Sequence, residues 1–155
     1  GEVAEGVNTL KVLKARAEEL VRLMDEDLTA IASAPPPVRR ETAIYYASGF
    51  TSGAGSLAHA IVEAAGFVNI APRLGLDARG TLPLEALILS GPDVVVRGQS
   101  FQGHSRGEEM LRHPVLERML QAPRVQAETR PEWSCGTPLT INAIRALQAI
   151  AGEKP

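Results

Sequence analysis

Small and polar side chains gather in three stretches of the chain, residues 48–56, 97–106 and 128–136. The residue types in these stretches that can bind a ligand are Ser52, Gly53, Ser100, His104, Arg106 and Trp133. Hydroxyl, imidazole and guanidinium groups bind anions or metals, and an indole ring can form the wall of an apolar pocket. Each stretch follows a short run of strand-forming residues. Ligands of open α/β sheets lie beyond the carboxyl ends of the strands, so we predict that the three loops form one binding surface.

The stretch Gly53-Ala-Gly-Ser-Leu-Ala58 matches the glycine fingerprint GxGxxA, between a predicted strand and a predicted helix. Dinucleotide-binding proteins use this pattern to bring backbone N–H groups close to a phosphate. That site also needs an acidic residue about 20 positions later, at the end of the next strand. Asp77 has roughly this spacing but lies in a loop, and the next strand ends at Asn69. A tight turn built of small residues is the favoured interpretation, and nucleotide binding stays open as an alternative.

Other patterns of catalysis and metal binding are weak. Ser52 does not lie in a GxSxG motif, and His59, His104 and His113 have no spacing that predicts a catalytic triad. No cluster of cysteine and histidine at ligand spacing is present, so neither a metal site nor a cofactor is predicted. Cys135 is the single cysteine, which excludes a disulfide within the chain and leaves its role open.

The elements that position these loops follow from periodicity and from turn residues. Apolar residues at steps of three and four predict a long helix over residues 1–33, which Pro35-Pro-Pro37 ends. Strands are predicted at 42–48, 67–70, 94–96 and 124–127, and helices at 56–65, 83–89, 107–119 and 138–151, with a division at His113-Pro114. This order predicts an α/β fold, a three-layer αβα lobe with a mainly parallel central sheet preceded by a long N-terminal helix.

Composition agrees with a single domain that has a hydrophobic core. The chain has 155 residues, of which 45% are hydrophobic and 22% charged, and its formal net charge is −2. No stripe of lysine and arginine predicts nucleic-acid binding. No apolar run reaches the roughly 18 residues of a membrane-spanning helix. The first residue is Gly1 and no signal peptide is recognisable, so we expect a processed or truncated chain.

Three segments, in order, resemble the class III solute-binding proteins of ABC transporters, which capture iron-siderophores, haem or cobalamin. The segment from Tyr45 to Asn69 ends in Glu63-Ala-Ala-Gly-Phe-Val-Asn, similar to the family's E-x-A-G-G-x-N with Phe67 in place of the second glycine. The segment Leu82-Pro-Leu-Glu-Ala-Leu, followed by Pro92-Asp-Val-Val-Val, is similar to a second family element. The ending Trp133-Ser-Cys-Gly-Thr-Pro with its terminal helix is a looser match.

The resemblance implies the C-terminal lobe of such a protein, with residues 1–34 continuing the interdomain helix and 35–155 forming the lobe. It implies that an N-terminal lobe is absent here, that the ligand is an iron chelate, haem or cobalamin, and that no residue is catalytic. By the same resemblance, Arg79 faces the ligand and Glu85 engages arginines of the membrane permease. The implied location is periplasmic or extracytoplasmic. We further expect the isolated lobe to bind ligand weakly and to dimerise through the surface it leaves exposed.

Two other interpretations remain open beside this one. The first is a nucleotide-binding α/β domain or enzyme that uses the loop Gly53–Ala58. The second is a domain that binds only protein, which a large exposed apolar face without a pocket would favour.

Overall fold

The computed structural model describes residues 2–99, 106–121 and 125–151. Its strands are β1 (Glu41–Tyr45), β2 (Phe50–Thr51), β3 (Val68–Asn69), β4 (Gly80–Thr81), β5 (Val94–Arg97) and β6 (Val125–Glu128). Its α-helices are α1 (Glu2–Ser33), α2 (Leu57–Ala64), α3 (Leu84–Ser90), α4 (Arg106–Glu109), α5 (Pro114–Gln121) and α6 (Thr140–Ala151). The 3-10 turns are η1 (Ala47–Gly49), η2 (Pro72–Leu74), η3 (Met110–Arg112) and η4 (Pro131–Trp133).

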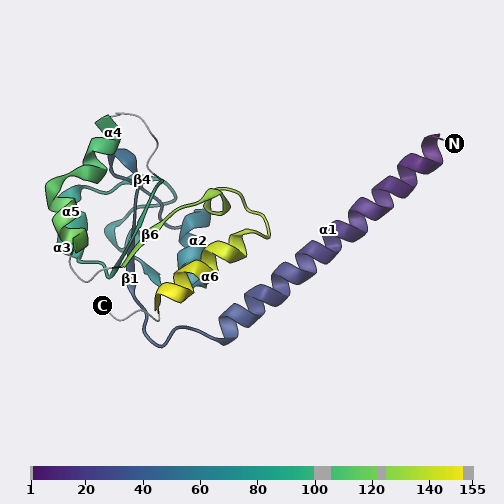
Figure 1. Cartoon of the computed structure of the whole chain (residues 1–155), viewed down its shortest axis with the longest axis horizontal. Coiled ribbons are helices and arrows are strands. Elements are labelled where there is room, and N and C mark those ends of the chain that lie inside the picture. Colours follow the sequence, from purple (N-terminus) through teal and green to yellow (C-terminus); the bar gives the residue numbers. More distant parts are fainter. Residues whose placement is uncertain (1, 100–105, 122–124, 152–155) are drawn as a thin grey trace.

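A four-stranded parallel sheet in the order β3-β1-β5-β6 forms the centre of the lobe (Figure 1). The residues Thr42–Tyr45 and Val94–Val96 are all buried, because helices cover both faces of a parallel sheet. Ile44, Val94 and Val96 pack with α2, α6 and the end of α1, and Ala43, Tyr45 and Val95 pack with α3, α5 and η3. The predicted αβα lobe with a mainly parallel sheet is therefore confirmed.

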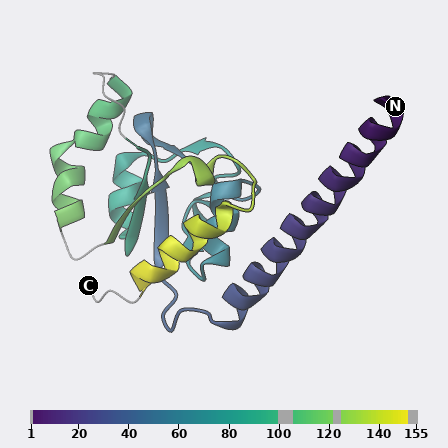
Figure 2. The same ribbon diagram turned by 45° about the vertical axis from the view of Figure 1, so that its right-hand side comes forward.

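Helix α1 leaves the lobe and projects far beyond it (Figures 1 and 2). Near its carboxyl end, Met24 and Leu28 pack on the core, Ile31 is buried, and Asp27 forms an ion pair with Arg145 of α6. The same apolar face continues towards the amino end at spacings of three and four residues, but there Leu10, Leu13 and Val21 are 67%, 60% and 59% exposed. The long helix is thus confirmed, and only its last turns are held by this lobe.

Two details differ from the sequence-based expectation. The first strand ends at Tyr45, and not at Ser48, because Ser48 adopts a positive φ of 59° and turns the chain, so that the Tyr46 N–H donates to the Phe50 carbonyl at 2.7 Å. Residues 50–51 then pair antiparallel with residues 80–81 as the two-stranded sheet β2-β4, which was not predicted. The predicted division at His113-Pro114 is present, because α4 and η3 end there and α5 begins at Pro114.

Candidate functional site

A cavity of about 500 Å³ opens at the carboxyl ends of β1, β5 and β6. Its wall consists of Tyr46 and Ala47 after β1, Gly98 and Gln99 after β5, Thr129, Arg130, Pro131 and Ser134 after β6, and Leu111 from η3. Parallel strands bring their carboxyl ends to one edge of the sheet, and this edge is where α/β folds bind ligands. The cavity has the size of a small-molecule site.

The Tyr46 side chain forms part of this wall. A Cβ added at Gly98 would lie 3.1 Å from Cδ1 of Tyr46, so the ring lies directly against the backbone that follows β5. Burial raises the pKa of Tyr46, and the nearby Ser52 side chain lowers it by less. The ring is therefore a fixed, half-buried and mostly apolar surface that carries one polar atom.

Among the described residues, the remaining polar groups of the wall are uncharged, apart from Arg130. Gln99, Thr129 and Ser134 supply amide and hydroxyl groups that can both donate and accept hydrogen bonds. Arg130 is exposed and is the only ionised side chain among the described residues that line the cavity. A guanidinium pairs well with the carboxylate, phosphate or deprotonated oxygen of a ligand. The wall therefore suits a mainly apolar ligand with an anionic or carbonyl-rich edge.

The structure distributes the residues predicted from the sequence over several places. Ser52 lies near the Tyr46 side chain but does not line the cavity, and the exposed Arg79 and Arg106 do not line it either. Trp133 belongs to η4, between the cavity residues Pro131 and Ser134, but its side chain is only 6% exposed and packs in the core with α2 and α6. Ser100 and His104 lie outside the described residues. Among the described residues, the cavity therefore draws on two of the three predicted loops, 97–106 and 128–136, and on Tyr46 and Ala47, which precede the loop 48–56.

Gly53 packs against another part of the backbone. A Cβ at this position would lie 2.0 Å from the carbonyl oxygen of Leu76 and 2.5 Å from that of Asp77. The Gly53 N–H already donates to the Asp77 carbonyl at 2.8 Å, and the Ser56 hydroxyl accepts from the His59 N–H at the start of α2. Carbonyl oxygens occupy the place where a nucleotide phosphate would need N–H donors. The geometry therefore favours the tight-turn interpretation of this glycine pattern over nucleotide binding.

Residues that sequence reasoning did not select are Tyr46, Gln99, Thr129, Arg130 and Ser134, all of which line the cavity. Tyr46, Gln99, Thr129 and Arg130 lie within two residues of the end of β1, β5 or β6. That closeness to a strand end is the signal that could have found them. Side-chain chemistry alone pointed to the middle of each loop.

Tyr45 and Glu85 lie on the other face of the sheet. Tyr45 is fully buried, and its hydroxyl has no hydrogen-bond partner among the described residues. Burial raises the pKa of Tyr45, and the nearby carboxylate of Glu85 raises it further. Glu85 is exposed in the first turn of α3, with its carboxylate close to the end of β1. The adjacent tyrosines thus face opposite sides of the strand, and Tyr45 belongs to the core.

We expect both tyrosines, which are the only two in the chain, to ionise above the usual pH of about 10. The unfolded chain loses these phenolic protons at the usual pKa, so the stabilisation is complete below that pH and disappears as pH rises through the higher native pKa values. Absorbance at 295 nm, followed through an alkaline titration with and without denaturant, measures this difference. Coincident titration curves would contradict the burial of both rings.

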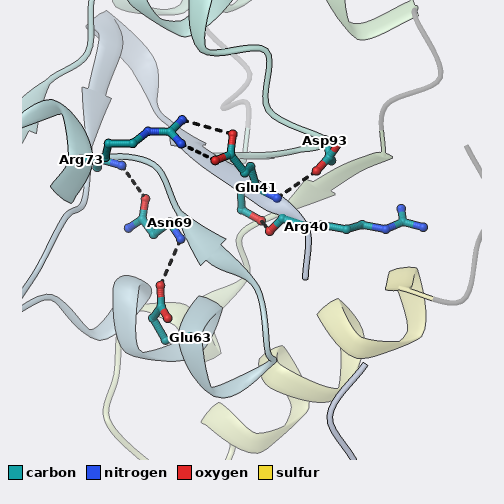
Figure 3. A network of polar contacts seen from close by, with 8 residues as sticks. Arg40, Glu41, Glu63, Asn69, Arg73 and Asp93 are labelled. Carbon is teal, nitrogen blue, oxygen red and sulfur yellow. Dashed lines mark hydrogen bonds and ion pairs between the residues drawn. The ribbon is translucent and has the colours of Figure 1, made fainter. Parts of the chain in front are cut away.

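A polar network ties the opposite, amino-terminal edge of the sheet together (Figure 3). Arg73 forms an ion pair with Glu41, the Glu41 N–H donates to Asp93 at 2.9 Å, and the Asn69 N–H donates to Glu63 at 3.1 Å. Glu41 and Asp93 lie at the starts of β1 and β5, none of these groups lines the cavity, and each acid has a donor. We therefore assign this network a structural role.

Within residues 2–99, 106–121 and 125–151, no group of three or more His, Cys, Asp or Glu side chains could hold a metal ion. None of the described helices combines the length and hydropathy required to cross a bilayer.

Solved structures with the same fold bind several kinds of ligand. A protein of an ABC-type Fe3+-hydroxamate transport system from Saccharomonospora viridis superposes with a TM-score of 0.69 at 23% identity, covering 96% of this chain and 55% of that chain. The periplasmic haem-binding protein RhuT from Roseiflexus sp. gives 0.64 at 20% identity, covering 88% and 57%. The periplasmic vitamin B12 binding protein BtuF of Vibrio cholerae gives 0.63 at 16% identity, covering 93% and 56%.

The chain spans little more than half the length of these structural relatives. No curated protein matches the chain in a sequence comparison. A family model described as periplasmic binding protein matches residues 3–126, which include α1, the strands β1 to β5 and the helices α2 to α5. The chain therefore belongs to the periplasmic binding protein family.

Proposed function

We propose that this chain is the C-terminal lobe of the solute-binding component of an ABC importer, and that it captures an iron-siderophore, haem or cobalamin-type compound. The observation that carries the proposal is the cavity at the carboxyl ends of β1, β5 and β6, in a chain of this family. Its wall combines the Tyr46 ring with uncharged polar groups and Arg130, which suits large, partly apolar metal chelates with polar edges. In this proposal the chelate is cargo and not a cofactor.

The exposed apolar face of α1 is an argument for a second protein lobe packed beside this one. Leu10, Leu13 and Val21 continue the same apolar stripe that packs Met24 and Leu28 on the core, so whatever covers them lies on the same side of the helix. A hollow of about 800 Å³ along α1 is lined by that helix alone, and one helix cannot enclose a small molecule. We propose that residues 1–34 connect to a second lobe, that residues 35–155 form this one, and that the ligand lies between them.

The proposal places the protein in the periplasm or another extracytoplasmic space, with the membrane permease as its partner. Glu85 is the residue we assign to that contact, because its carboxylate is exposed at the start of α3 and can pair with an arginine of the permease. No residue is assigned a catalytic role.

The direct test is a thermal-shift titration of the protein produced from its natural start codon. The probes are a ferric hydroxamate siderophore, haemin, cyanocobalamin, ATP and NAD. A ligand that binds only the native state raises the melting temperature in proportion to the logarithm of its concentration. Stabilisation by one of the metal compounds supports the proposal and identifies the cargo class. Stabilisation by ATP or NAD alone would overturn it.

We expect Tyr46→Ala to weaken binding of the stabilising compound by about tenfold or more, because the substitution removes an aromatic contact worth on the order of 1.5–3 kcal/mol. Arg130→Gln is expected to act similarly on an anionic compound and to have little effect on a neutral one. Arg118→Gln is the matched control, because Arg118 is exposed on α5 and does not line the cavity. An equal loss of affinity in all three variants would contradict the assignment of the cavity.

When the chain is prepared alone, the stripe of α1 is expected to promote self-association. Light scattering after size-exclusion chromatography measures the mass. The variant Leu10→Lys with Leu13→Lys places charges on the stripe and is expected to restore the monomer. A monomer at high concentration without these substitutions would contradict the expectation.

A further inference from the structure

Helix α3 has the composition of a buried helix, although one face of it is exposed. Its residues Leu84–Ser90 include one charged side chain, Glu85, and four large aliphatic ones. Leu87 is fully buried, whereas Ile88 is 36% exposed and Leu89 is 86% exposed. A helix that is apolar on all sides is normally covered on all sides. The outer face of α3 is therefore covered incompletely by this lobe.

Glu85, Ile88 and Leu89 lie on that outer face together. Their spacing of three and four residues places them one above the other on the helix surface. We call these three residues the α3 face. Helix α3 lies on the opposite side of the sheet from α1 (Figures 1 and 2). None of the three residues of the α3 face lines the cavity. A partner bound to the α3 face can therefore contact the lobe without touching the ligand or the stripe on α1.

The charge of the α3 face limits which partner fits it. A second copy related by twofold symmetry would bring the same patch onto itself, so that the Glu85 carboxylates of both copies would approach each other. An anionic lipid surface would repel the same carboxylate. A protein surface that presents a guanidinium beside apolar side chains satisfies both the carboxylate and the aliphatic groups.

We propose that Ile88 and Leu89 form the apolar part of the permease contact, next to the ion pair made by Glu85. This inference rests on the proposed function and adds two residues that no charge argument would select. An exposed ion pair contributes little affinity because water screens it. The burial of two aliphatic side chains contributes more, so Leu89→Ser is expected to weaken the complex by about tenfold or more.

The test is photo-crosslinking in living cells of the organism that makes this protein. p-Benzoylphenylalanine replaces Leu89, Glu85 or, as a matched control, Leu139, which is 62% exposed and lies just before α6 on the other side of the sheet. We expect positions 85 and 89 to crosslink to a multi-spanning permease subunit, identified by mass spectrometry, and position 139 not to do so. Leu89→Ser is expected to reduce the crosslink from position 85 by about tenfold with an unchanged melting temperature.

Two kinds of failure are distinguishable. Position 85 could crosslink to the permease while position 89 gives no crosslink, or crosslinks only to a second copy of the chain or to lipid. That result overturns the inference and leaves the proposed function standing. If neither position reaches a permease in cells that express one, the proposed function is overturned together with the inference. An unchanged crosslink from position 85 in the Leu89→Ser variant also overturns the inference.

Discussion

Gly53→Ala is expected to destabilise the lobe by about 4 kcal/mol, or to prevent folding. The added methyl group would lie 2.0 Å from the carbonyl oxygen of Leu76, which is a backbone atom, so the clash cannot be relieved by rotation of a neighbouring side chain. Relief requires the loop at Leu76–Asp77 to move away, which also breaks the bond from the Gly53 N–H to the Asp77 carbonyl. Urea denaturation followed by circular dichroism measures the loss in the free energy of unfolding.

Gly136→Ala is the matched control for this prediction. Gly136 lies in an exposed turn with no neighbouring atom within 4 Å of the added Cβ and no positive φ, so its substitution is expected to change stability by less than about 0.5 kcal/mol. If Gly53→Ala unfolded at the same urea concentration as Gly136→Ala, the close approach of the two loops would be refuted.

Asn69→Leu is expected to cost about 3 kcal/mol of stability, because Asn69 is 3% exposed and its amide connects two loops. Its Nδ2 donates to the Ser52 carbonyl at 2.7 Å, and its Oδ1 accepts from the Ala71 N–H at 3.1 Å. Leucine has a similar volume but leaves both buried backbone groups without these partners. Since Ser52 is held through this amide, its side chain is expected to move relative to Tyr46 as well.

The control is Asn142→Leu on the exposed side of α6, with an expected change below about 0.5 kcal/mol. The second readout is the titration of Tyr46 by absorbance at 295 nm, because displacement of the Ser52 side chain, which lowers the pKa of Tyr46, is expected to raise that pKa further. A variant with unchanged stability and an unchanged tyrosine titration would show that Asn69 does not connect the two loops.

Much of the fold could be predicted because the relevant signals are local. The buried run Val94–Val96 marks a central parallel strand, the triple proline marks the end of α1, and His113-Pro114 marks a division between helices. The pairing of β2 with β4 could not be predicted in the same way. It joins two-residue segments about 30 positions apart, and neither segment has a periodicity that a sequence pattern can report.

The edge of the sheet that carries the candidate site could be predicted, but the residues that line the cavity could not. Parallel topology alone places the carboxyl ends of β1, β5 and β6 at one edge of the sheet. Which side chains face the cavity depends on packing between distant segments. Trp133 is a loop residue by sequence, yet its ring packs in the core, and Tyr46 faces the cavity because Gly98 leaves room for its ring.

Helix α1 has a consequence for how the lobe responds to its surroundings. The helix has 32 residues and a length of about 48 Å at 1.5 Å per residue, but its packing on the core described above begins only at Met24. A helix without tertiary packing is marginally stable in water, so the backbone amides of residues 6–20 should exchange their hydrogens quickly in the chain alone, while those near Ile31 exchange slowly. Any protein surface that covers the apolar stripe would slow the exchange of the amide hydrogens in the amino-terminal half of α1. Hydrogen exchange of one helix would therefore report, residue by residue, whether the lobe is alone or accompanied.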